Sequence, residues 1–379
     1  MPKNFDFNLK VLSFISSILF FPILFTNIFL QSEYHFVVLA QTFISGHLDI
    51  QTLPYVSDFA QFNGRYFSPL GPFPAIVVAP FLIILKSYPT ESPLKIPLML
   101  INLFLIFQIS KILTNDRTKA MLLAIFYIFG SILTPVEVYP FSTYFSQLIV
   151  TTLLLYAIWE FLNHKRYFLI GTAVALSFLT RGTTIFASLF FLMFLFKKPI
   201  NIRSLVLFVL PILISICLFF SYNYLRFGSI FESGYRYQFI NQKLEARRNI
   251  GIFSIHHVPE NLYALFLKLP NFNTRFPFFK PDNMGMSIFI MSPILFLLIK
   301  IKFKEIYVKE AALTTLLILL PILLYYGIGF KQIGFRYALD FFPFILIMLA
   351  QITKKMQVST IAFLVFLGVF ITFLATFSP

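Results

Sequence analysis

The feature that most constrains this chain is a series of apolar runs, each about as long as one bilayer crossing, that recurs along nearly the whole sequence. A hydrocarbon core of about 30 Å requires roughly 20 apolar residues per helical span. Hydrophobic residues make up 58% of the 379, and charged residues only 12%. A soluble domain of this length could not bury so much apolar surface. The sequence therefore predicts an all-α polytopic membrane protein.

The basic residues fall mostly in short clusters between the apolar runs. Lys and Arg beside membrane helices keep their loops in the cytoplasm. We therefore attribute the net charge of +15 to topology and do not expect nucleic acid as a partner. The predicted cytoplasmic clusters are Lys3 with Lys10, Lys111 with Arg117 and Lys119, Lys165 with Arg166, Lys197 with Lys198 and Arg203, Lys300 with Lys302, Lys304 and Lys309, and Lys354 with Lys355.

These clusters fix the direction of each crossing in a single membrane-embedded domain, residues 1–379, of about 11 transmembrane helices. The N-terminus is expected in the cytoplasm, and the run from Val11 to Leu30 is longer than the apolar region of a signal peptide. The other expected spans are Ala120 to Val138, Ser142 to Leu162, a hairpin flanking Arg181, Leu205 to Phe220, Met286 to Ile299, Ala311 to Tyr326, Tyr337 to Ala350 and Ile361 to Phe377. Phe73 to Leu85 and Ile96 to Ile109 must together cross once, so the first is expected to be short or re-entrant.

Two polar segments are expected outside the cytoplasm. The first outer loop, residues 32–72, begins with apolar residues at helical spacing between Tyr34 and Ser45, which is typical of a helix lying in the membrane interface. The second, residues 221–285, is polar enough to fold over the membrane surface. The lone cysteine, Cys217, excludes a disulfide framework and a cysteine-based metal site. It is expected to be a small buried hydrophobic residue.

Five segments, in order along nearly the whole chain, resemble motifs of bacterial GT-C glycosyltransferases, in particular family 39-like members. These integral membrane enzymes take sugars from polyprenyl-phosphate carriers. The segments are SEYHFVVLAQTFISGHLDI from Ser32 to Ile50, SDFAQFNGRYFSPLGPFPA from Ser57 to Ala75, ALSFLTRGTTIFA from Ala175 to Ala187, YNYLRFGSIFESGY from Tyr222 to Tyr235, and GFRYALDFFPF from Gly334 to Phe344. The resemblance implies a GT-C-like bundle whose extracytoplasmic loops carry the active site.

The resemblance also implies an inverting transfer in which a carboxylate of the first outer loop activates an acceptor hydroxyl. Asp58 and Glu33 are the candidate bases, because a general base must lie within hydrogen-bond reach of that hydroxyl. Asp58 is favoured by its turn-like neighbours, which include Arg65 and Tyr66 as candidate substrate contacts. Relatives often carry an acidic pair where this chain has Ser32 and Glu33, and that departure weighs against Glu33. Either carboxylate has the alternative of a solvated loop residue or helix cap.

Cations are needed to stabilise the charge that develops on the departing phosphate. Arg181 interrupts an apolar stretch from Tyr167 to Phe196, where an unpaired arginine is costly. Each arm of that hairpin has about 14 residues, too short for a full crossing, so Arg181 is expected near the outer headgroups. The other candidate phosphate ligands are Arg226, Arg236 and Arg336. A simple snorkelling or solvated arginine is the alternative for each.

The candidate partners are a polyprenyl-phosphate-linked sugar, membrane lipids, and a glycan, lipid or protein acceptor. No residue is assigned as a metal ligand, although the resemblance leaves a divalent cation open and His35 lies beside Glu33. A transporter or flippase of a lipid-linked substrate is the alternative function, and it predicts internal repeats with mid-membrane binding residues. The expected location is the bacterial inner membrane, with the active site outside. The sugar, the acceptor, the polyprenol and the oligomeric state are not specified by the sequence.

Overall fold

The computed structural model describes residues 20–30, 33–86, 90–197, 199–274, 278–329 and 332–377. The chain is mostly helical, and four of the described helices are long and apolar enough to cross a membrane: Ser92–Thr114, Ser142–Asn163, Ile202–Phe227 and Val358–Phe377. Lys3, Lys10, Ser32, Lys198 and the first half of the predicted first helix lie outside the described residues. The rest of that helix is Phe20–Phe29.

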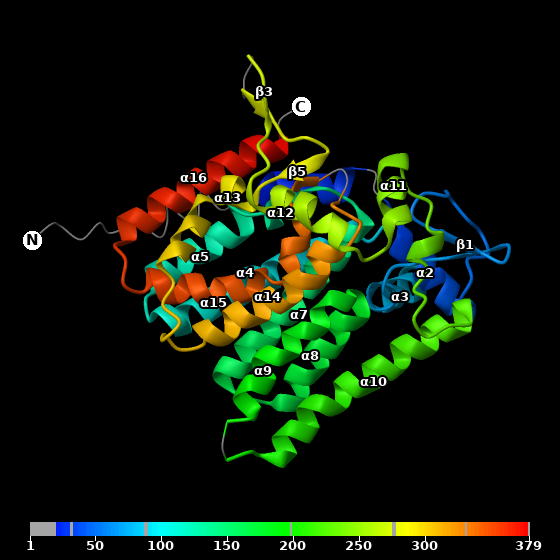
Figure 1. The fold of residues 1–379 in the computed structure, drawn as a ribbon, viewed down its shortest axis with the longest axis horizontal. Helices are drawn as coiled ribbons and strands as arrows, with labels where there is room; N and C mark the ends of the chain where they lie inside the picture. The colour runs from blue at the N-terminus through cyan, green and yellow to red at the C-terminus, as the bar shows by residue number, and fades with distance from the viewer. Residues whose placement is uncertain are drawn as a thin grey trace, which may run out of the picture.

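The elements follow one another as a run of helices with three small two-stranded sheets between them (Figure 1). The α-helices after Phe20–Phe29 are α2 His35–Ile44, α3 Phe73–Leu85, α4 Lys95–Thr114, α5 Arg117–Phe129, α6 Leu133–Val138, α7 Ser142–Asn163, α8 Tyr167–Thr180, α9 Ser188–Leu195, α10 Ile202–Phe227, α11 Gln242–Ile250, α12 Val258–Phe266, α13 Ile288–Met291, α14 Val308–Leu324, α15 Phe342–Thr353 and α16 Val358–Phe377. The 3₁₀ helices are η1 Ser92–Leu94, η2 Gly182–Ala187, η3 Tyr235–Tyr237, η4 Ile255–His257, η5 Pro293–Lys300 and η6 Arg336–Asp340. The strands are β1 Ala60–Phe62, β2 Arg65–Phe67, β3 Asn271–Phe272, β4 Phe279–Lys280, β5 Met284–Met286 and β6 Gln332–Gly334.

The segment that follows the first outer loop forms a short helix before a long one, as the charge pattern predicts. α3 has the bounds expected for the short element, and it packs mainly along α2, with smaller contacts to α7 and α8. α4, continuous with η1, is then long and apolar enough to cross a membrane. The hairpin around Arg181 also forms, with 14 residues in α8 and a second arm of η2 and α9. A carbon added to Gly171 of α8 would lie 2.2 Å from the Phe208 carbonyl, so only glycine lets α10 approach this closely.

Two of the predicted spans each form two shorter helices instead of one, and another part of the chain contacts each junction. The run from Ala120 to Val138 forms α5 and α6, separated at Gly130, whose carbonyl accepts a hydrogen bond from the Ser292 hydroxyl at 2.9 Å. A carbon added to Gly368 of α16 would lie 3.2 Å from that same carbonyl. The run from Met286 to Ile299 forms the short α13 and the 3₁₀ helix η5, with Ser292 at their junction. Local sequence contributes to both breaks, because Pro293 disfavours a helical Ser292 and Gly130 weakens its helix, and the tertiary contacts then hold them.

α14 and α15 connect two different pockets of the molecule. Val308 at the start of α14 and Ile352 near the end of α15 line a small pocket. Ile322 near the end of α14, and Tyr337 just before α15, line a much larger cavity. The 17 residues of α14 span about 25 Å at 1.5 Å per residue. The two pockets therefore lie at opposite ends of this helix pair.

Predicted cytoplasmic clusters meet at the small-pocket end of these helices. Lys119 donates a hydrogen bond to the Lys354 carbonyl at 2.7 Å, and Lys197 pairs with Glu310 of α14 at 3.1 Å. Lys355 pairs with Glu305 at 2.6 Å. Clusters that are far apart in sequence are therefore neighbours in space.

α10 lies along one edge of the molecule, where Figure 1 shows it as a long helix beside α8 and α9. Its apolar side chains are largely exposed, including Leu213, Ile214 and Leu218. Cys217 lies on this face and is exposed, so the expectation that it would be buried is wrong. The cause is that α10 packs on one side only, which leaves the opposite side with the composition of a lipid-facing surface.

Candidate active site

A cavity of about 690 Å³ gathers side chains from both polar segments and from the ends of several helices. Its size is within the range of small-molecule sites. Five candidate residues line it: Glu33, Asp58, Arg181, Arg236 and Arg336. They are separated by as many as 303 residues in the chain (336 minus 33), so the fold brings them together. Further lining residues include Tyr144, Thr183, Tyr235, Gln238, Tyr325 and Tyr337.

Asp58 reaches this cavity because the two outer segments pair as extended chains. The Asp58 N–H donates to the Phe239 carbonyl at 2.9 Å, and the Phe239 N–H donates back to the Phe59 carbonyl at 2.9 Å. The side-chain amide of Gln238 donates to Asp58 Oδ1 at 3.2 Å. Asp58 has a left-handed backbone with φ of 65°, which is uncommon outside glycine and is tolerated best by Asn and Asp. The carboxylate is therefore held in a defined position by both segments.

The hairpin that follows Asp58 agrees with the turn expected from its sequence. β1 and β2 pair in antiparallel register around Asn63 and Gly64, both with positive φ. Two consecutive positive φ angles are the requirement of a tight two-residue hairpin turn, which Asn-Gly satisfies with little strain. Arg65 and Tyr66 lie on β2 and are not among the residues that line the cavity.

Glu33 is anchored to the segment before α7. Its N–H donates to the Pro140 carbonyl at 3.2 Å, and the N–H of His35 donates to the Ser142 hydroxyl oxygen at 3.0 Å. His35 is buried, and its Nε2 lies 3.2 Å from the Ser57 carbonyl. A carbonyl only accepts, so Nε2 carries the proton in this contact. His35 thereby joins the helix that follows Glu33 to the residue before Asp58.

Three buried charged residues, Lys95, Glu91 and Glu137, lie near the segment that holds Glu33. Lys95 of α4 is 2% exposed, and its amine donates to the Tyr139 carbonyl at 2.7 Å. Glu91 and Glu137 are also buried and act electrostatically on Lys95. The group supports the turn at Tyr139, which is next to the residue that holds Glu33. Nothing in the local sequence signals the association of Lys95 with these acids.

Arg181 forms an ion pair with a buried carboxylate. Its Nε donates to Asp340 Oδ1 at 2.7 Å, while the Thr183 hydroxyl donates to Asp340 Oδ2 at 2.5 Å. Asp340 is fully buried, and Arg181 keeps a side-chain exposure of 17% at the cavity. Arg336, four residues earlier on the chain, would lie beside Asp340 in an α-helix, but the carboxylate pairs with Arg181 instead. Residues 336–340 form a 3₁₀ helix, which does not give the α-helical i,i+4 geometry.

Arg336 faces the same cavity from beside Arg181. Its guanidinium carbon lies 5.0 Å from the Tyr337 ring centroid and 5.3 Å from that of Tyr144. The Arg181 guanidinium carbon lies 5.3 Å from the Tyr337 centroid as well, so the two arginines share one aromatic neighbour. The Nε of Arg336 is buried and has no hydrogen-bond partner within the described part of the chain. A buried guanidinium N–H without a partner is unfavourable unless a ligand accepts from it.

Tyr235 lies between the cationic and acidic sides of the cavity. Burial raises the pKa of its hydroxyl, while the positive charges of Arg181 and Arg336 act in the opposite direction and the charge of Asp58 raises it further. Tyr235 therefore remains a neutral hydrogen-bond donor at physiological pH. The sequence analysis did not single out Tyr235, Tyr337 or Thr183 as site residues, although each falls inside a quoted motif.

Two candidate arginines have other surroundings. Arg226 is 5% exposed and donates to the carbonyls of Ser68 and Tyr222 and to the side chain of Asn223. It clamps the first outer loop to the end of α10 and is not among the residues lining the cavity. Arg236 does line the cavity, but its side chain is 70% exposed and lies 3.9 Å from Glu232. Arg181 and Arg336 are thus the fixed cations of the site.

No cluster of three or more His, Cys, Asp or Glu side chains suited to a metal ion occurs in residues 20–377 outside the gaps named above. His35 is engaged with Ser57, Ser142 and Tyr55. We therefore derive no chemical step through a metal.

No protein-family model, curated protein or solved structure matches this chain.

Proposed function

We propose that the protein is a glycosyltransferase that moves a sugar from a polyprenyl-phosphate donor to a hydroxyl acceptor with inversion. The observation that carries the proposal is that two carboxylates and two arginines beside aromatic rings line one cavity. Transfer from a glycosyl phosphate needs a base for the acceptor and cations for the leaving phosphate. The five sequence motifs that resemble GT-C enzymes support the same assignment.

In the proposed reaction, Asp58 accepts the proton of the acceptor hydroxyl while that oxygen attacks the anomeric carbon of the sugar. The bond between the anomeric carbon and the phosphate oxygen breaks, and the polyprenyl phosphate leaves with the bonding electrons. Arg181 and Arg336 stabilise its charge, since the planar guanidinium group can donate two hydrogen bonds to one phosphate. Glu33 is the second candidate base, because it lines the same cavity.

The ion pair of Arg181 with Asp340 serves this role by fixing the arginine in place. Asp340 uses one oxygen for Arg181 Nε and the other for Thr183, which leaves the terminal nitrogens of Arg181 for a ligand. Groups that are already oriented need no rearrangement as charge develops. The Nε of Arg336 offers a further buried donor.

The proposal places this cavity on the extracytoplasmic side of a bacterial inner membrane, in a GT-C-like bundle of about 11 transmembrane helices with a cytoplasmic N-terminus. The meeting of Lys119, Lys197 and Lys354 at the end of α14 and α15 away from the cavity supports that orientation. The acceptor is a glycan, a lipid or a protein.

The test is to supply labelled polyprenyl-phosphate sugars to membranes with and without the protein and to analyse the products. Protein-dependent appearance of label in a new glycoside supports a glycosyltransferase. Movement of an intact labelled donor between leaflets, with no new glycoside, would instead support the transporter or flippase alternative. Membranes with an Asp58→Asn variant are the matched control, because that change leaves the size of the side chain almost unaltered.

A further inference from the structure

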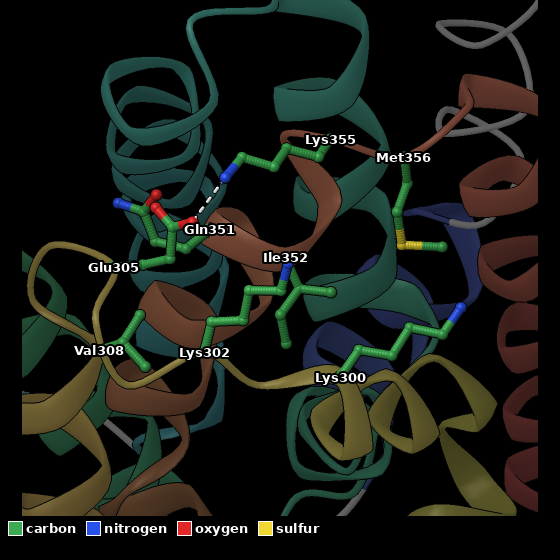
Figure 2. Close-up of a pocket in the computed structure, with 8 residues that line it drawn as sticks. All are labelled: Lys300, Lys302, Glu305, Val308, Gln351, Ile352, Lys355 and Met356. Carbon is green, nitrogen blue, oxygen red and sulfur yellow. Dashed lines mark hydrogen bonds and ion pairs between the residues drawn. The ribbon is translucent and has the colours of Figure 1, made fainter.

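We propose that the small pocket at the far end of α14 and α15 binds the phosphate headgroup of an anionic lipid in the leaflet opposite the active site. The lysine pocket, as we call it, has a volume of about 160 Å³ and is lined by Lys300, Lys302, Glu305, Val308, Gln351, Ile352, Lys355 and Met356 (Figure 2). This inference does not depend on the proposed glycosyl transfer.

The charge of the lysine pocket is the first observation. Three lysines line it with a single acid, Glu305, which pairs with Lys355 at 2.6 Å. Figure 2 shows Lys355 pointing toward Glu305, with the Lys302 amine beside Ile352 and Lys300 on the other side of the pocket. The hydrogen bond from Lys355 and the charges of Lys302 and Lys354 lower the pKa of Glu305. The acid therefore stays ionised, and two lysine charges remain uncompensated inside the pocket.

The lysines are not needed to complete the end of α15. Lys119 already donates to the Lys354 carbonyl at 2.7 Å, which satisfies a carbonyl at the helix C-terminus. Lys300 is the last residue of η5 and Lys302 lies just after it, and neither makes an ion pair with a described carboxylate. Their convergence on a cavity is therefore available for an anion from outside the chain.

The composition of this segment favours a lipid over a soluble anion. Large exposed apolar side chains alternate with its lysines: Ile299, Phe303 and Ile306 are 85%, 59% and 60% exposed. Apolar residues exposed next to basic ones are typical of the boundary between acyl chains and headgroups. Val308, Ile352 and Met356 give the pocket an apolar wall as well. Basic pockets between membrane helices on the cytoplasmic side are suited to anionic headgroups.

The test uses the purified full-length protein in phosphatidylcholine nanodiscs with or without phosphatidylglycerol, and measures bound phosphatidylglycerol by native mass spectrometry. Each lysine at an anionic surface contributes roughly a fivefold gain in binding, so Lys300→Gln with Lys302→Gln should lower retention about 25-fold. The matched control is Arg117→Gln with Arg203→Gln, which removes two exposed basic residues outside the pocket. An equal loss in both double variants would overturn the proposal in favour of general attraction.

A substitution of opposite sign gives a second test. Glu305→Gln removes the only acid that lines the pocket and frees Lys355, so retention of phosphatidylglycerol should rise severalfold. Unchanged or weaker retention in a folded Glu305→Gln protein would contradict the proposal. Inorganic phosphate should displace the lipid poorly, because it cannot use the apolar wall. Complete displacement by phosphate would show a soluble-anion site instead of a lipid site.

Discussion

The positive charges at the two ends of α14 and α15 come from different residues in different surroundings. At the cavity, the cations are arginines: Arg181 is bonded to buried Asp340, and Arg336 stacks on two tyrosines. At the lysine pocket, the cations are long, exposed amines, of which Lys355 pairs with the half-buried carboxylate of Glu305. A fixed, planar guanidinium suits directed stabilisation of one phosphate, whereas mobile lysines suit attraction to a charged surface.

This contrast teaches that net charge alone does not identify a site. Both ends are basic, and the chain carries +15 overall. At the cavity, Asp58 and Glu33 are held by backbone hydrogen bonds to segments that are distant in the chain, whereas the backbone N–H of Glu305 at the lysine pocket bonds within its own turn, to Lys302. Chemistry is therefore expected at the cavity, and binding without chemistry at the lysine pocket.

The largest expected effect is a difference in labelling between the cavity end and the lysine-pocket end of α14 and α15. We expect these two ends to face opposite sides of the membrane. Single cysteines at Ser233 and Asn273, in a Cys217→Ser background, should react with an impermeant thiol reagent in intact cells. A cysteine at Lys304, next to the lysine pocket, should react only after permeabilisation. Labelling of all three from the same side would show that the cavity and the lysine pocket do not face opposite sides of the membrane.

Next in size is the loss of the proposed base. Asp58→Asn should lower transfer by about 10²- to 10⁴-fold, because the amide cannot accept the acceptor's proton. Asp49→Asn is the matched control, since Asp49 lies in the same loop but does not line the cavity. Initial rates of label transfer give the measurement. Near-normal rates for Asp58→Asn would shift the role to Glu33, and near-normal rates for Glu33→Gln too would rule out a carboxylate base from this loop.

Substitution of the cavity arginines should lower the transfer rate less than loss of the base. Comparison of the transfer rate with the stability of each variant separates an effect on donor binding from an effect on folding. Removing one stabilising donor typically costs about 10²-fold or more in rate, which we expect for Arg336→Gln. Arg181→Ala should also destabilise the protein by about 3–5 kcal/mol, because Asp340 is left buried without its partner. Arg181→Lys retains the charge and should rescue donor use only in part.

Rates against donor concentration, together with thermal unfolding in detergent, measure these variants. Wild-type kinetics in Arg181→Lys and Arg336→Gln would leave both arginines as structural residues.

The smallest effect is expected at the lysine pocket. Lys300→Gln with Lys302→Gln should change transfer by less than about twofold in neutral lipid, because surface charges about 25 Å from a reaction are largely screened. The measurement is the same transfer assay in phosphatidylcholine vesicles. A loss of transfer rate as large as that of Asp58→Asn would show that the lysine pocket and the cavity are coupled, which would contradict the separate roles given to them.

The sequence predicts most helices because length and charge act locally. Lys111 and Arg117 mark the turn between α4 and α5, and the bounds of α3 follow from a run too short to cross. The breaks at Gly130 and Ser292 have local signals in Gly130 and Pro293, but the close approach of α16 and the hydrogen bond between Ser292 and Gly130 could not be predicted, because they join residues distant in the chain.

The candidate site also has features that the sequence predicts and features that only the contacts reveal. Asp58, Glu33, Arg181, Arg236 and Arg336 were selected by residue type and motif, and they line one cavity. The partner of Arg181 could not be derived, because Asp340 is 159 residues away in the chain and no local pattern links the two. Arg226 has the motif context of a ligand but is used as a clamp, a role that only its contacts reveal.

In the proposed reaction, the acceptor oxygen displaces the polyprenyl phosphate in a single step, with one base and no covalent sugar intermediate. The measurement that tests it most directly is the anomeric configuration of the product formed by the purified protein from a synthetic polyprenyl-phosphate sugar and the acceptor found in membranes. Nuclear magnetic resonance coupling constants distinguish the two anomers. We expect a configuration opposite to that of the donor, whereas a product that retains the donor's configuration would rule out a single displacement.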